Sequence, residues 1–460
     1  MRDITKRFGS VTANDKCWLD IYRGEILALL GENGSGKTTL MNMLSGIYFP
    51  DEGQIFIDGR EVVIASPKDA FNLGIGMIHQ HFKLVDVFTA AENIILGLPG
   101  KLDIKQATKK IREICDKYGF EVNPDQKVYE MSVSQKQTVE IIKVLYRGAD
   151  ILILDEPTAV LTPQETEKLF AVLRNMRADN KAVVIITHKM HEVEELSDRV
   201  AVLRKGQFVG DMLTNTTNAQ EMTNMMAGRP VQLNIYRYPP VNSKDRLVVE
   251  GLTVVDEEGI TKLDNVSFTA KSGEILGIAG ISGCGQKELL ESIAGLQKVE
   301  SGSIRYLEND GSKEELIGKD PLAIKSLGVA LSFVPEDRLG MGLVANMGIS
   351  DNMMLRSYSS GRSVFTDRKN PHKLAGQMVD FLEIVTPSTE TPVRKLSGGN
   401  VQKVLVGREI PNAPTVLMTA YATRGLDINS SYTIYDLVAQ QKERGVAVIY
   451  VGEDLDVLLE

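Results

Sequence analysis

A glycine-rich segment at positions 31–39 has the residue types and spacing of a phosphate-binding loop. It reads Gly31-Glu32-Asn33-Gly34-Ser35-Gly36-Lys37-Thr38-Thr39, which matches the pattern G-x-x-x-x-G-K-T. An apolar run precedes this segment and a helix-forming stretch follows it. Glycines let consecutive backbone N–H groups approach phosphate oxygens, and the following helix adds its positive dipole end. The pattern predicts that Lys37 contacts the β- and γ-phosphates of a nucleotide and that the Thr38 hydroxyl binds Mg²⁺.

Two carboxylates follow an apolar run of buried-strand length at 151–154. They are Asp155 and Glu156, and a second apolar run at 183–187 ends before His188. A parallel sheet places the carboxyl ends of its strands beside the phosphate loop. We therefore expect Asp155 to bind Mg²⁺, directly or through water, and Glu156 to polarise an attacking water molecule.

The composition of the 460-residue chain is that of a globular protein with two or three domains. Hydrophobic residues make up 43%, yet no apolar run approaches the roughly 18 residues of a membrane-spanning helix. The charged N-terminus predicts no signal peptide. Three scattered cysteines, Cys17, Cys115 and Cys284, form no disulfide or metal-binding pattern, which fits a reducing cytosol. A net charge of −9 argues against a nucleic-acid partner.

The second half of the sequence repeats the first half. The loop at 31–38 returns as 280–287, and the segment 131–135 returns as 396–400. We therefore expect two copies of one α/β domain. Their predicted bounds are 1–228 and 247–460, joined by a linker at 229–246 that contains three prolines and has no periodicity.

The ordered motifs resemble those of the ATP-binding cassette (ABC) ATPases over essentially the whole chain. The loop, Gln80, the segment 131–135, the strand end at 151–156 and His188 occur in the order and spacing of that family. The resemblance implies two tandem P-loop NTPase domains, each an α/β core with a helical subdomain, and ATP and Mg²⁺ as cofactors. It also implies that Gln80 touches Mg²⁺ and senses a permease, that His188 contacts the γ-phosphate, and that Phe8 stacks on adenine.

The second copy lacks the side chains that the first copy would use for hydrolysis. Its residues at the positions of the lysine, the glutamine, the two carboxylates and the histidine are Gln286, Glu336, Ala420, Tyr421 and Glu453. A site without these groups cannot hydrolyse ATP, and the charge of Glu336 would repel phosphate.

The signature segments show the opposite distribution. The second copy has Ser397, Gly398, Gly399 and Asn400, which allow close backbone approach to a γ-phosphate at a helix start, whereas the first copy has no glycine within 131–135. In the family, each nucleotide lies between one phosphate loop and the signature of the opposite cassette. The resemblance therefore implies one competent ATP site, from the loop of copy one and the signature of copy two, and one degenerate site.

Two fused cassettes without membrane segments resemble the ATPase subunit of bacterial importers of nucleosides and simple sugars. Segments 79–82, 88–94, 283–286 and 334–338 are most similar to the purine-nucleoside branch. The resemblance implies integral-membrane permease partners, an extracellular substrate-binding lipoprotein, no nucleic acid, and a position at the cytoplasmic face of the membrane. Within the segment 80–97, we expect an exposed apolar pair, Phe82 and Leu84, to contact the permease.

Alternatives stay open at this level. A ribose- or galactose-type sugar importer is the first. A soluble tandem-cassette ATPase that acts on ribosomes is the second, although such proteins usually keep both sites intact and have a long charged linker. A non-hydrolysing nucleotide-binding regulator is the third, and Glu156 and His188 argue against it. The end at Glu460, soon after the last histidine-like position, predicts either a fragment or an open sheet edge in copy two.

Overall fold

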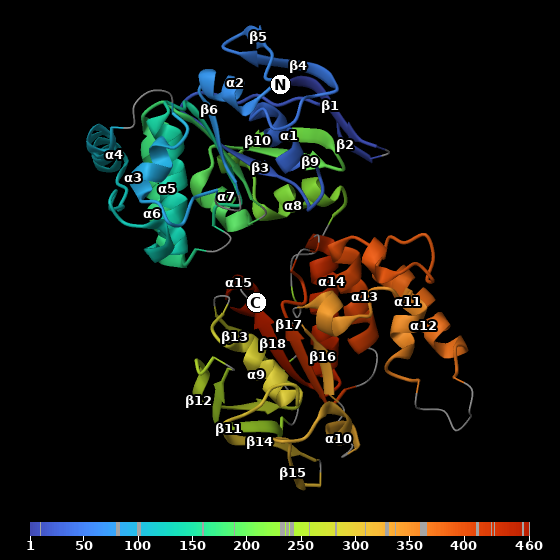
Figure 1. The fold of residues 1–460 in the computed structure, drawn as a ribbon. Coiled ribbons are helices and arrows are strands. Elements are labelled where there is room, and N and C mark those ends of the chain that lie inside the picture. Colours follow the sequence, from blue (N-terminus) through green and yellow to red (C-terminus); the bar gives the residue numbers. More distant parts are fainter. Residues whose placement is uncertain are drawn as a thin grey trace. The chain divides into compact units, whose positions relative to one another are not determined.

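The computed structural model divides the chain into two compact units, Met1–Val231 (unit 1) and Gln232–Glu460 (unit 2) (Figure 1). Among the described residues, no helix is long and apolar enough to cross a membrane. The residues described are all except 10, 80–82, 99–102, 159–160, 188, 231–234, 236–238, 240–242, 257, 281–282, 309, 327–330, 336, 359–365, 411–413, 425, 427, 453–454 and 460.

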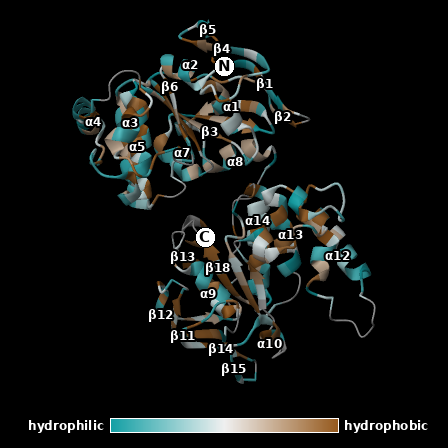
Figure 2. Ribbon diagram, viewed as in Figure 1, coloured by the Kyte–Doolittle hydropathy of each residue, from teal (hydrophilic) through white to brown (hydrophobic). Residues whose placement is uncertain are grey.

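A mostly parallel sheet forms the centre of unit 1, with the strand order β10-β9-β3-β8-β7-β6. Every residue of β3 and β8 is buried, as expected for parallel strands that are covered on both faces. Figure 2 shows the hydrophobic character of these central strands. The strands are β3 (Ile26–Leu30), β6 (Ile75–Ile78), β7 (Ile151–Asp155), β8 (Ala182–Ile186), β9 (Arg199–Arg204) and β10 (Gln207–Leu213), the last antiparallel to β9.

An antiparallel sheet and a helical region complete unit 1. The sheet has the order β2-β1-β4-β5, and the helical region has its own apolar core built from α3, α4 and α5. The sheet strands are β1 (Arg2–Phe8), β2 (Val11–Cys17), β4 (Glu52–Ile57) and β5 (Arg60–Val62). The helices are α1 (Lys37–Leu44), α2 (Pro67–Asn72), α3 (Ala90–Ile95), α4 (Ile104–Tyr118), η1 (Val128–Glu130), α5 (Val133–Tyr146), α6 (Pro163–Ala178), α7 (Met190–Leu196), η2 (Thr214–Thr216) and α8 (Ala219–Ala227).

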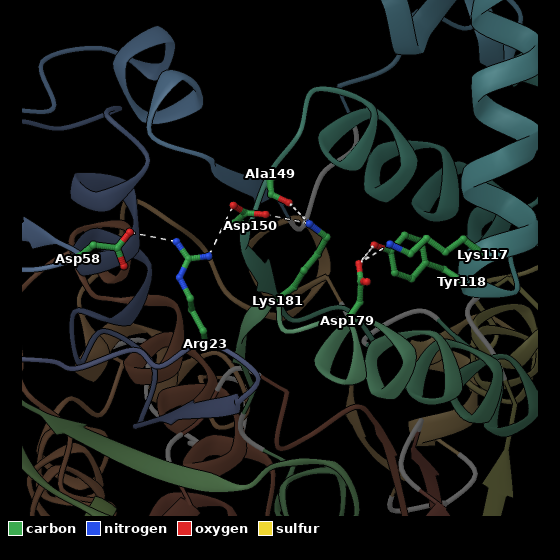
Figure 3. A network of polar contacts seen from close by, with 8 residues as sticks. All are labelled: Arg23, Asp58, Lys117, Tyr118, Ala149, Asp150, Asp179 and Lys181. Carbon is green, nitrogen blue, oxygen red and sulfur yellow. Dashed lines mark hydrogen bonds and ion pairs between the residues drawn. The ribbon is translucent and has the colours of Figure 1, made fainter.

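A network of ion pairs joins these parts of unit 1 (Figure 3). Arg23, just before β3, pairs with Asp58 of the β4–β5 turn at 3.1 Å and with Asp150, just before β7, at 3.6 Å. Lys117 of α4 pairs with Asp179, the C-cap of α6, at 2.6 Å. Exposed pairs of this kind contribute at most about 1 kcal/mol each. They therefore orient the segments that they join more than they add to the free energy of folding.

Unit 2 repeats this architecture with the sheet orders β13-β18-β17-β16 and β12-β11-β14-β15. Its strands are β11 (Asp245–Val255), β12 (Thr261–Lys271), β13 (Ile275–Ala279), β14 (Ser301–Leu307), β15 (Lys313–Glu315), β16 (Leu331–Val334), β17 (Val416–Ala420) and β18 (Ala447–Gly452). Its helices are α9 (Gln286–Ile293), α10 (Pro321–Ser326), η3 (Arg338–Gly342), α11 (Ile349–Met354), α12 (Lys369–Phe381), η4 (Val393–Lys395), α13 (Gly398–Glu409), α14 (Ile428–Glu443) and α15 (Leu455–Leu459).

Two features of unit 2 bear on the sequence-based expectations. Within the described part of the chain, β13 is an edge strand of its sheet, which does not distinguish between the two alternatives. The expected linker at 229–246 is too long at its C-terminal end, because β11 begins at Asp245 and pairs there with Lys271 of β12. The domain bounds 1–228 and 247–460 otherwise stay a prediction.

A buried carboxylate anchors the C-terminal end of α13, the helix that begins with the signature of unit 2. Glu409 is fully buried, and its Oε1 accepts hydrogen bonds from Arg408 Nε at 2.7 Å and Arg356 Nε at 3.0 Å. A buried charge is tolerated only when it is paired, so these contacts constrain α13.

Replacing this carboxylate should destabilise unit 2 selectively. Glu409→Ala leaves two guanidinium groups without their shared partner and should lower the free energy of unfolding of unit 2 by about 3–5 kcal/mol. Trp18 is the only tryptophan and lies in unit 1, so its fluorescence reports on unit 1. In a urea titration, circular dichroism should show an earlier transition while the Trp18 midpoint stays unchanged. An equal shift of both signals would contradict this expectation.

Candidate functional site

The glycine-rich loop of unit 1 connects the carboxyl end of β3 to the start of α1. Gly36 has φ of 95°, and a Cβ there would lie 2.4 Å from the carbonyl oxygen of Ala13, so only glycine fits. Strand β2 holds the loop from one side, because Asn14 Nδ2 donates to the Gly36 carbonyl oxygen at 3.2 Å. Inside the loop, the Ser35 N–H donates to the Glu32 carbonyl oxygen at 3.1 Å.

The Lys37 side chain lies buried over this loop. Its Nζ donates to the carbonyl oxygens of Gly31 at 2.7 Å and Glu32 at 3.0 Å. Burial lowers the pKa of Lys37, and the nearby carboxylates of Glu156 and Asp155 partly oppose that shift. A phosphate anion would stabilise the ammonium group in these surroundings, because it supplies a full opposite charge.

Thr38 and Asp155 meet beside Lys37. Thr38 Oγ1 donates to Asp155 Oδ2 at 3.1 Å, which joins the first turn of α1 to the end of β7. Burial raises the pKa of Asp155, and the hydrogen bond from Thr38 partly opposes that shift. A hydroxyl and a carboxylate oxygen are ligands that Mg²⁺ prefers, so these two residues fit the predicted metal. The structure thus brings Lys37, Thr38 and Asp155 together.

Glu156 follows β7 in a left-handed backbone conformation, with φ of 47°. Its N–H donates to the Ile186 carbonyl oxygen of β8 at 2.9 Å. Tyr421 occupies the same place after β17, with φ of 52°, and its N–H donates to the Val451 carbonyl oxygen of β18 at 3.0 Å. Because unit 2 repeats the conformation without the carboxylate, the conformation belongs to the fold and only the side chain could provide catalysis.

Phe8 ends β1 as an exposed aromatic ring, 44% exposed. Its strand pairs with β2, the strand that contacts the loop through Asn14. The Tyr48 ring meets the Phe8 ring edge-on, with 5.2 Å between the centroids, and Lys6 Nζ lies 5.6 Å from the Phe8 centroid. The contact of Tyr48 with Phe8 was not predicted from the sequence. The adjacent aromatic residues at 48–49, just beyond α1, are a signal that could have indicated it.

In unit 2 the described glycines of the equivalent loop, Gly283 and Gly285, keep the positive φ of Gly34 and Gly36, but the side chains around them differ. Helix α9 begins at Gln286 as α1 begins at Lys37, and Gly285 has φ of 92°. A cavity of about 380 Å³ lies there, and most of its lining is apolar. It is lined by Gln286, Lys287, Leu290, Glu291, Phe333, Pro335, Asp337, Met341, Ala420 and Tyr421.

The two signature segments also differ. Ser397 is the N-cap of α13, its Oγ accepts from Asn400 Nδ2 at 2.9 Å, and α13 starts with Gly398 and Gly399. In unit 1 the N-cap is Ser132, and an exposed Val133 occupies the first helical position. A branched side chain there obstructs the backbone approach that glycine permits.

For some residues that the sequence predicts for the site, the structure gives no placement or a different one. Gln80, His188 and Phe82 lie outside the described residues, as do Glu336 and Glu453. The assignment of Leu84 to an exposed pair is wrong, because Leu84 packs against the apolar core of the helical region. Among the described residues of this segment, the exposed apolar side chains are Val85, Val87 and Leu96, and Val87 is 65% exposed.

Comparison with known proteins identifies close likenesses. The family model described as ABC transporter matches residues 15–159 and 263–420. The chain is 41% identical to the nucleoside import ATP-binding protein NupA of Lactococcus lactis subsp. cremoris, over 100% of this chain and 91% of that protein. It is 40% identical to the guanosine import ATP-binding protein NupO of Bacillus subtilis, over 100% and 90%. It is 36% identical to the ribose import ATP-binding protein RbsA of Corynebacterium glutamicum, over 99% and 86%.

A solved structure of archaeal ribosome recycling factor aABCE1, in complex with the ribosomal stalk protein aP1, is similar over nearly the whole chain. The TM-score is 0.65 at 18% identity, covering 98% of this chain and 84% of that chain. At this identity the likeness shows the fold alone. Together with the two family-model matches, it confirms the predicted fold class of two tandem P-loop ATPase domains.

The lysine and its counterpart in unit 2 form a matched pair for a binding test. Lys37→Ala removes a charge-assisted phosphate contact and should weaken ATP binding by about 1.5–3 kcal/mol. Gln286→Ala removes a neutral side chain at the same backbone position and should leave ATP affinity nearly unchanged. Isothermal titration of both variants with Mg-ATP measures the difference, and an equal loss of affinity would argue against a functional asymmetry.

Proposed function

The chain belongs to the ABC transporter family of ATPases, and on that basis we propose that it is the ATP-hydrolysing subunit of a nucleoside importer. Two relatives at 41% and 40% identity are named for nucleoside and guanosine import, which supports a nucleoside as substrate. Import of a simple sugar is the second candidate, supported by the ribose import relative at 36%. The partners are membrane permease subunits. We also propose that an extracellular substrate-binding lipoprotein is an indirect partner and that the chain lies at the cytoplasmic face of the membrane.

One observation carries the assignment of ATP hydrolysis to unit 1. Lys37 lies over the phosphate loop beside the Thr38–Asp155 contact at 3.1 Å. Unit 2 has Gln286 and Ala420 at the equivalent backbone positions. At these equivalent positions, only unit 1 therefore carries the charged side chains, Lys37 and Asp155, that could bind Mg-ATP.

The proposed mechanism follows from these side chains. Lys37 and the N–H groups of the loop bind the phosphates, and the stacked ring of Phe8 orients adenine. Thr38 and Asp155 would hold Mg²⁺, with Gln80 as a further ligand, and the bound ion neutralises phosphate charge. Glu156 accepts a proton from the attacking water.

The remaining groups complete the site in this proposal. His188 positions the attacking water against the γ-phosphate. Ser397, Gly398, Gly399 and Asn400 of unit 2 donate to the γ-phosphate from the start of α13. The equivalent pairing of the unit 2 loop with Ser132 of unit 1 would carry no hydrolysis, because Gln286 and Ala420 replace the lysine and the metal-binding carboxylate.

Removing the proposed base tests hydrolysis directly. Glu156→Gln keeps the size of the side chain and loses its basicity, so Mg-ATP should still bind while turnover in the permease complex is abolished. Tyr421→Phe is the matched control at the equivalent position of unit 2, and its turnover should equal that of the wild type. The assignment fails if Glu156→Gln retains a substantial fraction of the wild-type phosphate release.

The exposed valines of unit 1 test the permease contact. Replacing Val85 and Val87 by Ser removes apolar surface that a partner would cover, so co-purification with the permease should fall while ATP binding by the isolated subunit persists. Val63→Ser, at a residue that is 71% exposed and directly follows β5, is the control and should not affect co-purification. Wild-type recovery of permease with the double variant would rule out this contact surface.

A further inference from the structure

A single buried amide holds the turn at 344–347 in unit 2. Asn352 of α11 is fully buried. Its Oδ1 accepts from the Val344 N–H at 2.8 Å, and its Nδ2 lies within donating distance of the Val344, Met347 and Gly348 carbonyl oxygens, at 3.2, 3.3 and 3.0 Å. The Met347 N–H also donates to the Val344 carbonyl oxygen at 3.0 Å. The Asn352 side chain therefore fixes both ends of the turn.

Unit 1 repeats this arrangement at the turn 85–88. Asn93 is buried, its Oδ1 accepts from the Val85 N–H at 2.7 Å, and its Nδ2 donates to the carbonyl oxygens of Val85 and Thr89, both at 3.0 Å. The Phe88 N–H donates to the Val85 carbonyl oxygen at 3.1 Å. Unit 2 keeps this amide although its nucleotide site has lost lysine and carboxylates. The amide therefore serves the shape of the turn and not the chemistry of the nucleotide.

The turn of unit 2 is hydrogen-bonded to the segment that enters the signature helix. The Arg394 N–H donates to the Ala345 carbonyl oxygen and the Val393 N–H donates to the Met347 carbonyl oxygen, both at 3.0 Å. Val393 and Arg394 belong to η4, which ends two residues before Ser397. Preceding the turn, Arg338 donates from Nη1 to the Gly398 carbonyl oxygen at 3.0 Å. The turn, η4 and the start of α13 thus form one hydrogen-bonded assembly.

The turn also carries exposed apolar surface. Val344 is 42% exposed and Met347 is 37% exposed, and they occupy the positions that Val85 and Phe88 occupy in unit 1. A rigid turn loses less conformational freedom when a partner covers it than a flexible one does. The fixed shape therefore favours binding of a partner.

We propose that Asn352 is a positioning residue that couples permease contact at 344–347 to the placement of Ser397 and Gly398. This rests on the proposed function, in which the permease covers these turns and the unit 2 signature completes the ATP site. Asn93 holds the equivalent turn, which leads to the signature at Ser132. The two amides therefore make equivalent hydrogen bonds, but only Asn352 should affect ATP hydrolysis.

The test compares Asn352→Ala with Asn93→Ala in the full chain. Each variant removes the acceptor of one backbone N–H, so hydrogen exchange at Val344 or Val85 should accelerate at least tenfold. In Asn352→Ala, exchange at 393–397 should accelerate as well. Permease binding should weaken similarly in both variants. At saturating permease only Asn352→Ala should lower the ATPase rate, by tenfold or more, while ATP affinity of the isolated subunit changes less than twofold.

Two further variants separate positioning from general destabilisation. Ile349→Val trims the same helix without touching a hydrogen bond and should leave exchange and turnover unchanged. Asn352→Asp keeps the acceptor for the Val344 N–H but places an oxygen against the three carbonyl oxygens, so its effect should be at least as large as that of Asn352→Ala. Unchanged exchange at 393–397 in Asn352→Ala, or equal loss of turnover in Asn93→Ala, overturns the inference. A wild-type chain that neither binds nor responds to the permease overturns the proposed function instead, and the exchange measurement still decides the positioning role.

Discussion

The buried ammonium group of Lys37 is the constraint on which the chemistry of unit 1 depends. Two carbonyl oxygens hold it at 2.7 and 3.0 Å, and burial lowers its pKa. Carbonyl dipoles compensate a buried positive charge only in part, whereas a phosphate anion compensates it fully. Strand β3 and helix α1 fix the backbone on both sides of the loop, so the Lys37 ammonium group stays over the loop. The Thr38–Asp155 contact at 3.1 Å places metal-binding oxygens next to that charge.

Unit 2 separates what the fold requires from what the chemistry requires. It keeps the glycine conformation at Gly285 and the left-handed residue after β17, which in unit 1 accompany the loop and Glu156. It also keeps the buried amide of Asn352 and its hydrogen bonds to the turn. The groups that it has lost are those with charge, at Gln286 and Ala420. Backbone geometry and the shape of this turn are therefore maintained in both units, while the lysine and the metal-binding carboxylate of the nucleotide site occur only in unit 1.

Much of this arrangement could be predicted from the sequence, because it depends on local patterns. The apolar runs at 151–154 and 183–187 correspond to the buried strands β7 and β8. Contacts between distant segments carry no such pattern. The inward packing of Leu84 against the helical core, the contact of Tyr48 with Phe8 and the pairing of Asp245 in β11 all depend on neighbours far along the chain. Periodicity does not report such neighbours.

The most direct test of the one-site account is the amount and location of nucleotide trapped during turnover. The chain, in complex with its permease, is incubated with Mg-ATP and orthovanadate, which arrests ABC-type hydrolysis after phosphate release. Bound ADP is then counted, and an azido-ATP analogue identifies the labelled peptides. The account predicts one trapped nucleotide per chain, with all label in peptides of unit 1 and of the signature at 397–400. Two trapped nucleotides per chain, or label at the loop that precedes Gln286, would contradict it.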